Sequence, residues 1–278
     1  MRLLALILCF MAGPLSAGES LTVGVLAFRN EAQTTAQWKP LETYLNATVP
    51  AFTFTVKALN LKDLREAISR RQVDLVITQP AEYVRLTHEN GLSAPLATLL
   101  NSDKGKPVRV FGGTIVARAD AANINSIHDL KGKKAVFASK ENFAAYQLQA
   151  YSLKKANIAL GSVVETGLSQ DVSIDAMRQG KADVAFVRSG LVETLVREGK
   201  LDAGTIKIVN QQAFPGYPFA VSTALHPEWP VVACRMCVKK LLRGWQAPYC
   251  YCPTTVQYLS KLAFTASRFP RTMNRYAP

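Results

Sequence analysis

Two stretches of this chain share one pattern and align with each other without a gap. Residues 67–86 read AISRRQVDLVITQPAEYVRL and residues 176–195 read AMRQGKADVAFVRSGLVETL. Each contains the end of a helix, a polar turn, an apolar strand that opens around an aspartate, Asp74 or Asp183, and then a second helix. Although any two strand–helix units look somewhat alike, this repeat favours two lobes of similar topology.

A second repeat and a regular alternation of elements support the same architecture. VGVLAFRNE (23–31) and KAVFASKEN (134–142) each run from a strand into a polar helix start, with nearly the same offset as the first repeat. Strand and helix patterns alternate along the first part of the chain, at residues 21–28, 35–46, 52–59, 61–71 and 73–78. This β-α-β-α-β order predicts an α/β fold with a doubly wound, mostly parallel sheet in each lobe.

The two lobes are expected to be joined by a hinge of two crossings, with a cleft between them. Strand-like residues 109–120 lead from the first lobe to the second, and residues 206–222 lead back. In open α/β sheets ligands bind beyond the carboxyl ends of the strands, where helix N-termini favour an anion. The repeat places Gln79 and Arg188 at equivalent strand exits, so we expect both side chains to face this cleft.

The N-terminus has the features of a secretory signal peptide. Arg2 precedes an apolar run from Leu3 to Met11, and a stretch with small residues ends at Ala17. Because the apolar run is too short to span a bilayer, we expect residues 1–17 to be cleaved and the mature protein to be exported.

The positive charge of the chain is concentrated at its C-terminal end. Residues 234–278 hold eight basic residues and no Asp or Glu, whereas the formal net charge of the whole chain is +13. The body of the protein is therefore only mildly basic, which argues against nucleic acid as a partner.

Several motifs follow one another in an order that resembles a known family. They are GVLAFRNEAQTTAQWKPLETYL, VDLVITQPAEYV, FGGTIVARAD with SIHDLKGKKAVFAS, ADVAFVRSGLVETL and STALHPEWP. Over about residues 20 to 233 the chain is similar to the type II periplasmic solute-binding proteins of the phosphate/phosphite/phosphonate-binding class. More narrowly, it resembles the periplasmic receptor domain of tetrathionate-type sensor histidine kinases. The resemblance implies a first lobe at residues 18–110, a second at 111–211 and a return to the first at 212–233.

This resemblance implies a periplasmic protein whose lobes close on a small anion. Transporter members deliver the anion to an ABC permease, whereas sensor members pass the closure to a membrane signalling domain. In phosphonate-binding relatives a Ser/Thr-rich loop at a helix start binds the phosphonate oxygens, and the matching residues 138–146 offer only Ser139 and Asn142. Arg188 stands where those relatives hold the ligand's amine with an acid. An arginine can clamp an oxyanion with two parallel hydrogen bonds. The expected ligand is therefore phosphate, phosphonate or a sulfur oxyanion such as tetrathionate.

Five further residues near strand exits and helix starts complete the predicted site. They are Phe28, Arg29, Tyr83, Gln170 and Tyr217. Four of them have an alternative role: Arg29 could be a solvated surface charge, Tyr83 could pack against its own helix, and Phe28 and Tyr217 could belong to the core.

An enzymatic function is not indicated by the sequence. His88, His128 and His226 lie in separate turn-like contexts without a metal-like or triad-like partner, and no phosphate-binding loop occurs. Binding without chemistry is therefore predicted, with no catalytic residue, no metal and no cofactor.

The segment CRMCVKKLLRGWQAPYCYC, residues 234–252, carries four of the five cysteines. It could hold a zinc or redox site in a secreted protein. However, the one-residue spacing of C-x-C is shorter than structural zinc sites usually have. Acidic residues and helical periodicity also end abruptly at this point. Read one base out of frame, residues 263–276 can encode GIHGFTIPADYEPV, which looks like the end of the sensor family. We therefore predict a frameshift near Ala233, followed by a poorly ordered tail.

Overall fold

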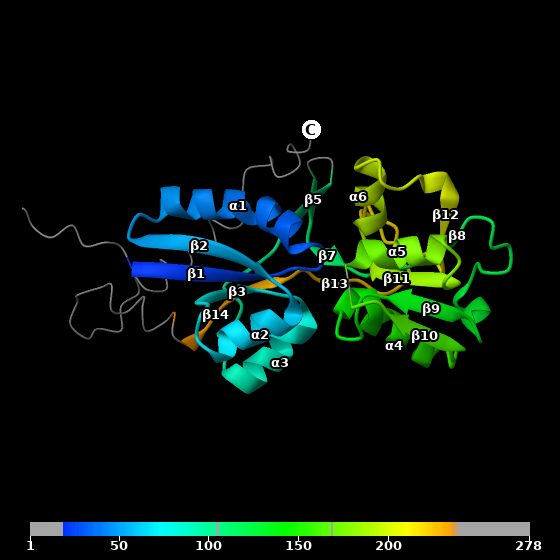
Figure 1. Cartoon of the computed structure of the whole chain (residues 1–278), viewed down its shortest axis with the longest axis horizontal. Coiled ribbons are helices and arrows are strands. Elements are labelled where there is room, and N and C mark those ends of the chain that lie inside the picture. Colours follow the sequence, from blue (N-terminus) through cyan, green and yellow to red (C-terminus); the bar gives the residue numbers. More distant parts are fainter. Residues whose placement is uncertain (1–18, 104–105, 168, 236, 238–278) are drawn as a thin grey trace, which may run out of the picture.

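The computed structural model describes residues 19–103, 106–167, 169–235 and 237. Figure 1 shows two lobes side by side, each built on a five-stranded sheet that has helices on both faces. The two-lobed α/β fold expected from the sequence repeat is confirmed. Within the described part of the chain, none of the helices combines the length and the apolar character that a membrane span requires.

The first lobe is formed by both ends of the described chain. Its elements are β1 (Glu19–Leu26), α1 (Glu31–Thr48), β2 (Phe52–Leu59), α2 (Leu61–Ser69), β3 (Leu75–Ile77), α3 (Pro80–Asn90), β4 (Ala97–Thr98) and β14 (Pro230–Ala233). The sheet order is β2-β1-β3-β14-β4, with β1 parallel to β2 and β3, and β14 antiparallel to β3 and β4. The sequence of β2, FTFTVKAL, begins by alternating buried and exposed side chains, because one face packs on the core.

The second lobe repeats this topology from one continuous segment. Its elements are β8 (Gly113–Arg118), η1 (Ile127–Leu130), β9 (Lys134–Phe137), η2 (Phe143–Gln147), α4 (Leu148–Lys155), β10 (Ser162–Glu165), α5 (Gln170–Arg178), β11 (Val184–Arg188), α6 (Leu191–Arg197), η3 (Ala203–Thr205) and β12 (Ile206–Val209). The sheet order is β10-β9-β11-β8-β12, and the single reversed strand is now β8. Each sheet is therefore mostly parallel, as predicted, with one antiparallel strand in the fourth place.

The two aspartates of the sequence repeat perform the same structural task. The main-chain N–H of Asp74 donates to the carbonyl of Thr22, and the N–H of Thr22 donates back to Oδ2 of Asp74, both at 2.8 Å. In the second lobe Asp183 and Lys134 form the same reciprocal pair at 2.9 and 2.7 Å. Each aspartate thus joins the start of its own strand to the neighbouring parallel strand.

The lobes are joined by a short ribbon of two strands, which lies between them in Figure 1. Strand β7 (Val110–Phe111) carries the chain into the second lobe and pairs antiparallel with β13 (His226–Pro227), which carries it back. The return comes later than the residue 212 expected from the sequence. Ser222 and Thr223 still bond to the second lobe, where their hydroxyls accept the main-chain N–H groups of Ile115 and Gly113.

The core of the first lobe includes two residues of the cysteine segment. Cys234 and Cys237 are 7% and 0% exposed and belong to the cluster of buried side chains that forms the core of the first lobe. The expected loss of order from Cys234 onward is therefore wrong at these two positions, where small apolar thiols fit the core. The predicted signal peptide and residues 238–278 lie outside the described residues.

Candidate functional site

The predicted anion clamp, Arg188, lies where the second lobe meets the first. It ends β11, and its guanidinium carbon lies 4.8 Å from the ring centre of Phe111 and 5.6 Å from that of Phe28. Its Nη2 donates to both carboxylate oxygens of Glu228, at 2.6 and 2.8 Å. Part of the guanidinium is thus occupied by the protein itself, and the bidentate clamp expected from the sequence is limited by this ion pair.

Two buried N–H donors beside Phe28 have no hydrogen-bond partner. They are Nε of Arg188 and Nε1 of Trp229, whose indole meets the Phe28 ring edge-on at 5.7 Å between centroids. A buried donor left without an acceptor costs about 1–3 kcal/mol, and such groups are rare in folded proteins. Two of them around one aromatic ring indicate a place where an acceptor from outside the chain would be stabilised.

Gln79 makes the reverse contact, from the first lobe to the second. Its side-chain amide donates to the carbonyl of Glu141 at 2.8 Å and accepts the main-chain N–H of Phe143, also at 2.8 Å. Gln79 and Arg188 therefore both reach across the interface from equivalent strand exits. Phe143 also packs against Phe111 at 6.0 Å, which connects the Gln79 contact to the aromatic residue under Arg188.

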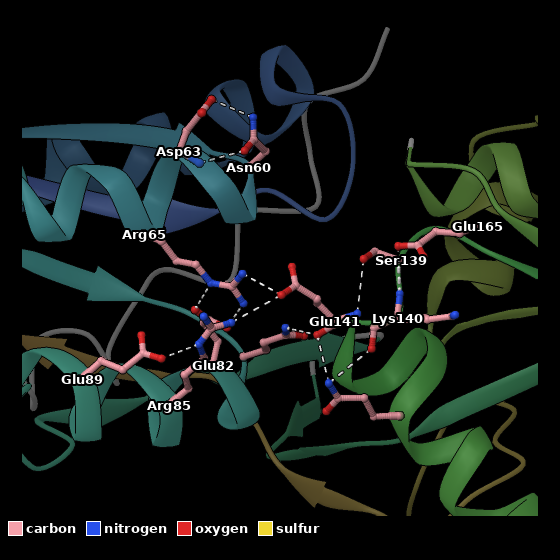
Figure 2. Close-up of polar contacts among 12 residues, drawn as sticks. Asn60, Asp63, Arg65, Glu82, Arg85, Glu89, Ser139, Lys140, Glu141 and Glu165 are labelled. Carbon is pink, nitrogen blue, oxygen red and sulfur yellow. Dashed lines mark hydrogen bonds and ion pairs between the residues drawn. The ribbon is translucent and has the colours of Figure 1, made fainter.

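The predicted ligand loop follows β9 and leads into the π-helical turn η2. The hydroxyl of Ser139 accepts the main-chain N–H of Glu141 at 3.2 Å, and Asn142 stands at the N-cap of η2 without a side-chain capping bond. Figure 2 shows this loop facing α2 and α3 of the first lobe. Of the two proposed hydroxyl and amide donors, Ser139 is thus engaged within the loop, whereas the Asn142 side chain does not cap the helix.

Arg29 bridges the two lobes rather than lying on a free surface. Its Nη1 and Nη2 donate to Glu198 at 2.9 and 3.0 Å, and its Nη2 also donates to Oδ2 of Asp171 at 2.8 Å. These hydrogen bonds raise the pKa of Arg29 and lower the pKa of Glu198 from 4.5 to about 2. Arg29 follows β1 of the first lobe, whereas both carboxylates belong to the second, so this ion pair holds the lobes together.

The other predicted site residues take different places. The side chain of Gln170 accepts the main-chain N–H of Arg188 at 2.8 Å and so supports that residue. Tyr217 shares a 2.6 Å hydrogen bond with Ser189, and burial raises its pKa to about 12. Tyr83 packs against the core of the first lobe and donates to the carbonyl of Ser93 at 3.3 Å.

The residues in contact with Arg188 or Phe28 that were not predicted from the sequence are Phe111, Glu228 and Trp229. Glu228 is 2% exposed and also accepts a 2.6 Å hydrogen bond from the side chain of Asn101. A signal was available, because Glu228 and Trp229 stand together in the motif STALHPEWP, directly before β14. Phe111 gave no such signal, since an apolar residue in a crossing strand is usually part of the core.

A hollow of about 650 Å³ on the second lobe is a weaker candidate. It is lined by residues that include Arg118, Asp120, Asp175 and Arg178, at the end of β8 that is remote from the hinge. These charges already pair with one another, Arg118 with Asp120 and Arg178 with Asp175. The interlobe side chains therefore form the better site.

The fold and the interlobe residues together define a two-lobed solute-binding protein. The chain belongs to the family described as ABC transporter, phosphonate, periplasmic substrate-binding protein, whose model matches residues 23–232. This is a family of substrate-binding domains rather than of enzymes. The family resemblance seen in the sequence motifs is thereby confirmed.

Relatives of this chain include both sensor and transport proteins. The tetrathionate sensor histidine kinase TtrS of Salmonella typhimurium is 31% identical over 215 residues, which are 76% of this chain and 36% of that protein. The phosphate-import protein PhnD of Mycolicibacterium smegmatis is 25% identical over 226 residues, 76% of this chain and 68% of that protein. The chain thus spans about a third of the sensor kinase that it matches.

The fold is also found in solved structures. A binding protein component of an ABC phosphonate transporter from Pseudomonas aeruginosa superposes with a TM-score of 0.62 at 14% sequence identity. The match covers 91% of this chain and 80% of that protein. At this identity the likeness concerns the fold.

Proposed function

We propose that this protein captures a small oxyanion between its lobes in the periplasm. The observation that carries the proposal is the pair of unpartnered N–H donors, Nε of Arg188 and Nε1 of Trp229, both in side chains that contact Phe28. An oxyanion supplies several strong acceptors and gains most from charge-assisted hydrogen bonds. Because Glu228 offsets part of the Arg188 charge, the site relies on directed donors more than on net positive charge.

The candidate ligands are phosphate, phosphonate and sulfur oxyanions such as tetrathionate. Membership in a phosphonate-binding family and similarity to a phosphate-import protein support the first two. Similarity to a tetrathionate sensor kinase supports the third and favours a role as the receptor part of a membrane signalling protein. The alternative is a free binding protein that serves an ABC permease. Export by residues 1–17 is part of this proposal.

Calorimetric titration of the purified protein with tetrathionate, phosphate, methylphosphonate and sulfate tests the proposal. Trp229→Phe keeps an aromatic ring beside Phe28 but removes the indole N–H donor together with part of the ring volume, a loss of volume that the control below shares. A lost hydrogen bond to a charged group is worth about 1.5–3 kcal/mol, so we expect affinity for the preferred oxyanion to fall roughly 10- to 100-fold. Trp38→Phe is the matched control, because Trp38 in α1 is likewise buried in the core of the first lobe.

Two results would count against the proposal. Absence of binding for all four oxyanions would remove the ligand class, and unchanged affinity in Trp229→Phe would remove the site. A sensor role predicts in addition that the nucleotide sequence after codon 233, read in the restored frame, encodes a transmembrane segment. A neighbouring permease gene would favour the transport alternative.

A further inference from the structure

One carboxylate of the second lobe is held by two arginines of the first. Glu141, in the loop between β9 and η2, accepts a 2.7 Å hydrogen bond on Oε1 from Nη1 of Arg65. Nη1 of Arg85 lies 3.4 Å from the same oxygen. Figure 2 shows the two guanidinium groups, from α2 and α3, converging on this carboxylate across the gap between the lobes.

Arg65 is fixed in this orientation before Glu141 arrives. Its Nε and Nη2 donate to the two carboxylate oxygens of Glu82, both at 2.6 Å, and the Glu82 side chain is only 4% exposed. Such a two-point pair with a buried carboxylate leaves the guanidinium little rotational freedom. The remaining Nη1 is therefore directed toward the second lobe at small further entropic cost.

The main chain beside Glu141 is held at the same place. Gln79 uses both atoms of its amide here, donating to the carbonyl of Glu141 and accepting the N–H of Phe143, each at 2.8 Å. The segment fixed in this way is residues 141–143. It contains Asn142 and lies just after Ser139, and these are the two polar residues of the loop that the sequence predicts to contact the ligand. The first lobe thus determines the position of the ligand loop on the second.

We propose that Glu141, Arg65, Arg85 and Gln79 form an interlobe latch that keeps the protein closed in the absence of ligand. The latch regulates the binding site of the proposed function, but its own operation needs no ligand. A ligand shifts an equilibrium only by its differential affinity for the two states. Because the latch already favours the closed conformation in the ligand-free protein, closing the lobes on binding costs less free energy. The apparent affinity for the ligand is therefore higher.

Glu141→Gln in the full chain tests the latch, because the side chain is half exposed and keeps its size. The corresponding change at Arg65 is unsuitable, since it would leave the buried Glu82 without its cation. Glu66→Gln is the matched control: it removes one negative charge from α2, where Glu66 pairs at 2.7 Å with Arg70, the C-cap residue of the same helix. Hydrogen exchange of the peptide covering residues 139–147, in ligand-free protein, reports opening, because the Phe143 N–H is bonded to Gln79.

We expect the closed-to-open ratio to fall about two- to fivefold in Glu141→Gln, the range of partly exposed ion pairs, and exchange to accelerate by the same factor. High salt should accelerate exchange in wild type more than in Glu141→Gln, since screening acts on the charge that is removed. The control should behave as wild type in both measurements.

Equal exchange rates in Glu141→Gln and wild type would overturn the latch. Exchange that is accelerated equally in Glu141→Gln and in Glu66→Gln would also overturn it, because the effect would then follow from the lost negative charge and not from the contact between the lobes. Neither result depends on oxyanion binding, so failure of the latch and failure of the proposed function are distinguishable.

Discussion

Arg188 and Glu228 form an ion pair that joins the end of a strand in the second lobe to the residue that directly follows β13, where the chain returns to the first lobe. The Nη2 of Arg188 lies 2.6 and 2.8 Å from the two oxygens of a carboxylate whose side chain is 1% exposed. The principal candidate ligand residue is thereby attached to the hinge itself. Its substitution should consequently affect folding as well as binding.

Arg188→Ala should lower the free energy of unfolding by about 3–5 kcal/mol, because Glu228 would remain buried without its cation. The double variant Arg188→Met, Glu228→Gln leaves no buried charge and should recover much of that loss. Urea unfolding of the three proteins measures the difference. If Arg188→Ala unfolds at the midpoint of wild type, the pair does not stabilise the fold.

The aspartates of the sequence repeat provide a comparison between the lobes. Asp74→Ala and Asp183→Ala each remove the acceptor for a main-chain N–H of the neighbouring strand. Asp74 is 3% exposed whereas Asp183 is partly exposed, so water can replace only the second acceptor. We expect Asp74→Ala to cost about 1–3 kcal/mol and Asp183→Ala less, as measured by denaturant unfolding. A larger loss in Asp183→Ala would contradict this account.

Acid should weaken the Arg29–Glu198 ion pair in a defined pH range. Because hydrogen bonds from Arg29 lower the pKa of Glu198 from 4.5 to about 2, the folded protein binds this proton less readily than the unfolded chain. The pair's stabilisation is therefore present above pH 4.5 and is lost as the pH falls toward about 2. Arg29→Gln should be less stable than wild type at pH 7, and the two unfolding curves should converge over this range. A stability difference that does not vary with pH would refute the assignment.

Cys234 should resist alkylation in the folded protein. Burial, and then the charge of Asp74, raise the pKa of its thiol to about 12, and only 7% of the residue is exposed. Since the thiolate is the reactive form, modification by iodoacetamide at pH 8 should be at least about a hundredfold slower than in urea. Mass spectrometry of the Cys234 peptide measures this ratio. Comparable rates in the two conditions would show that the segment is not packed as described.

The sequence was sufficient to predict the lobes because their signals are local. The repeat around Asp74 and Asp183 reflects a strand start that each lobe builds in the same way, and the equal offset then places Gln79 and Arg188 at equivalent exits. Both residues do reach across the lobe interface. Periodicity and spacing carry this information without any knowledge of distant contacts.

The partners of those residues could not be predicted in the same way. Glu228 reaches Arg188 only because the return crossing pairs with β7, and the sequence indicated an earlier return. Arg29 illustrates the same difficulty. The sequence left open whether Arg29 lies on the surface or contacts a ligand, whereas the structure pairs it with two carboxylates far along the chain. Side-chain pairing of this kind depends on how the lobes meet, which no local pattern encodes.

The ribbon of β7 and β13 has a mechanical consequence. Two separate linkers would allow the halves of the molecule to swivel and slide independently, but strands that are hydrogen-bonded to each other bend as one unit. The relative motion of the two lobes is then confined largely to rotation about one hinge axis. A small solute bound between the lobes would rotate one lobe relative to the other through a defined angle. A rotation of defined angle is a movement that another protein can detect.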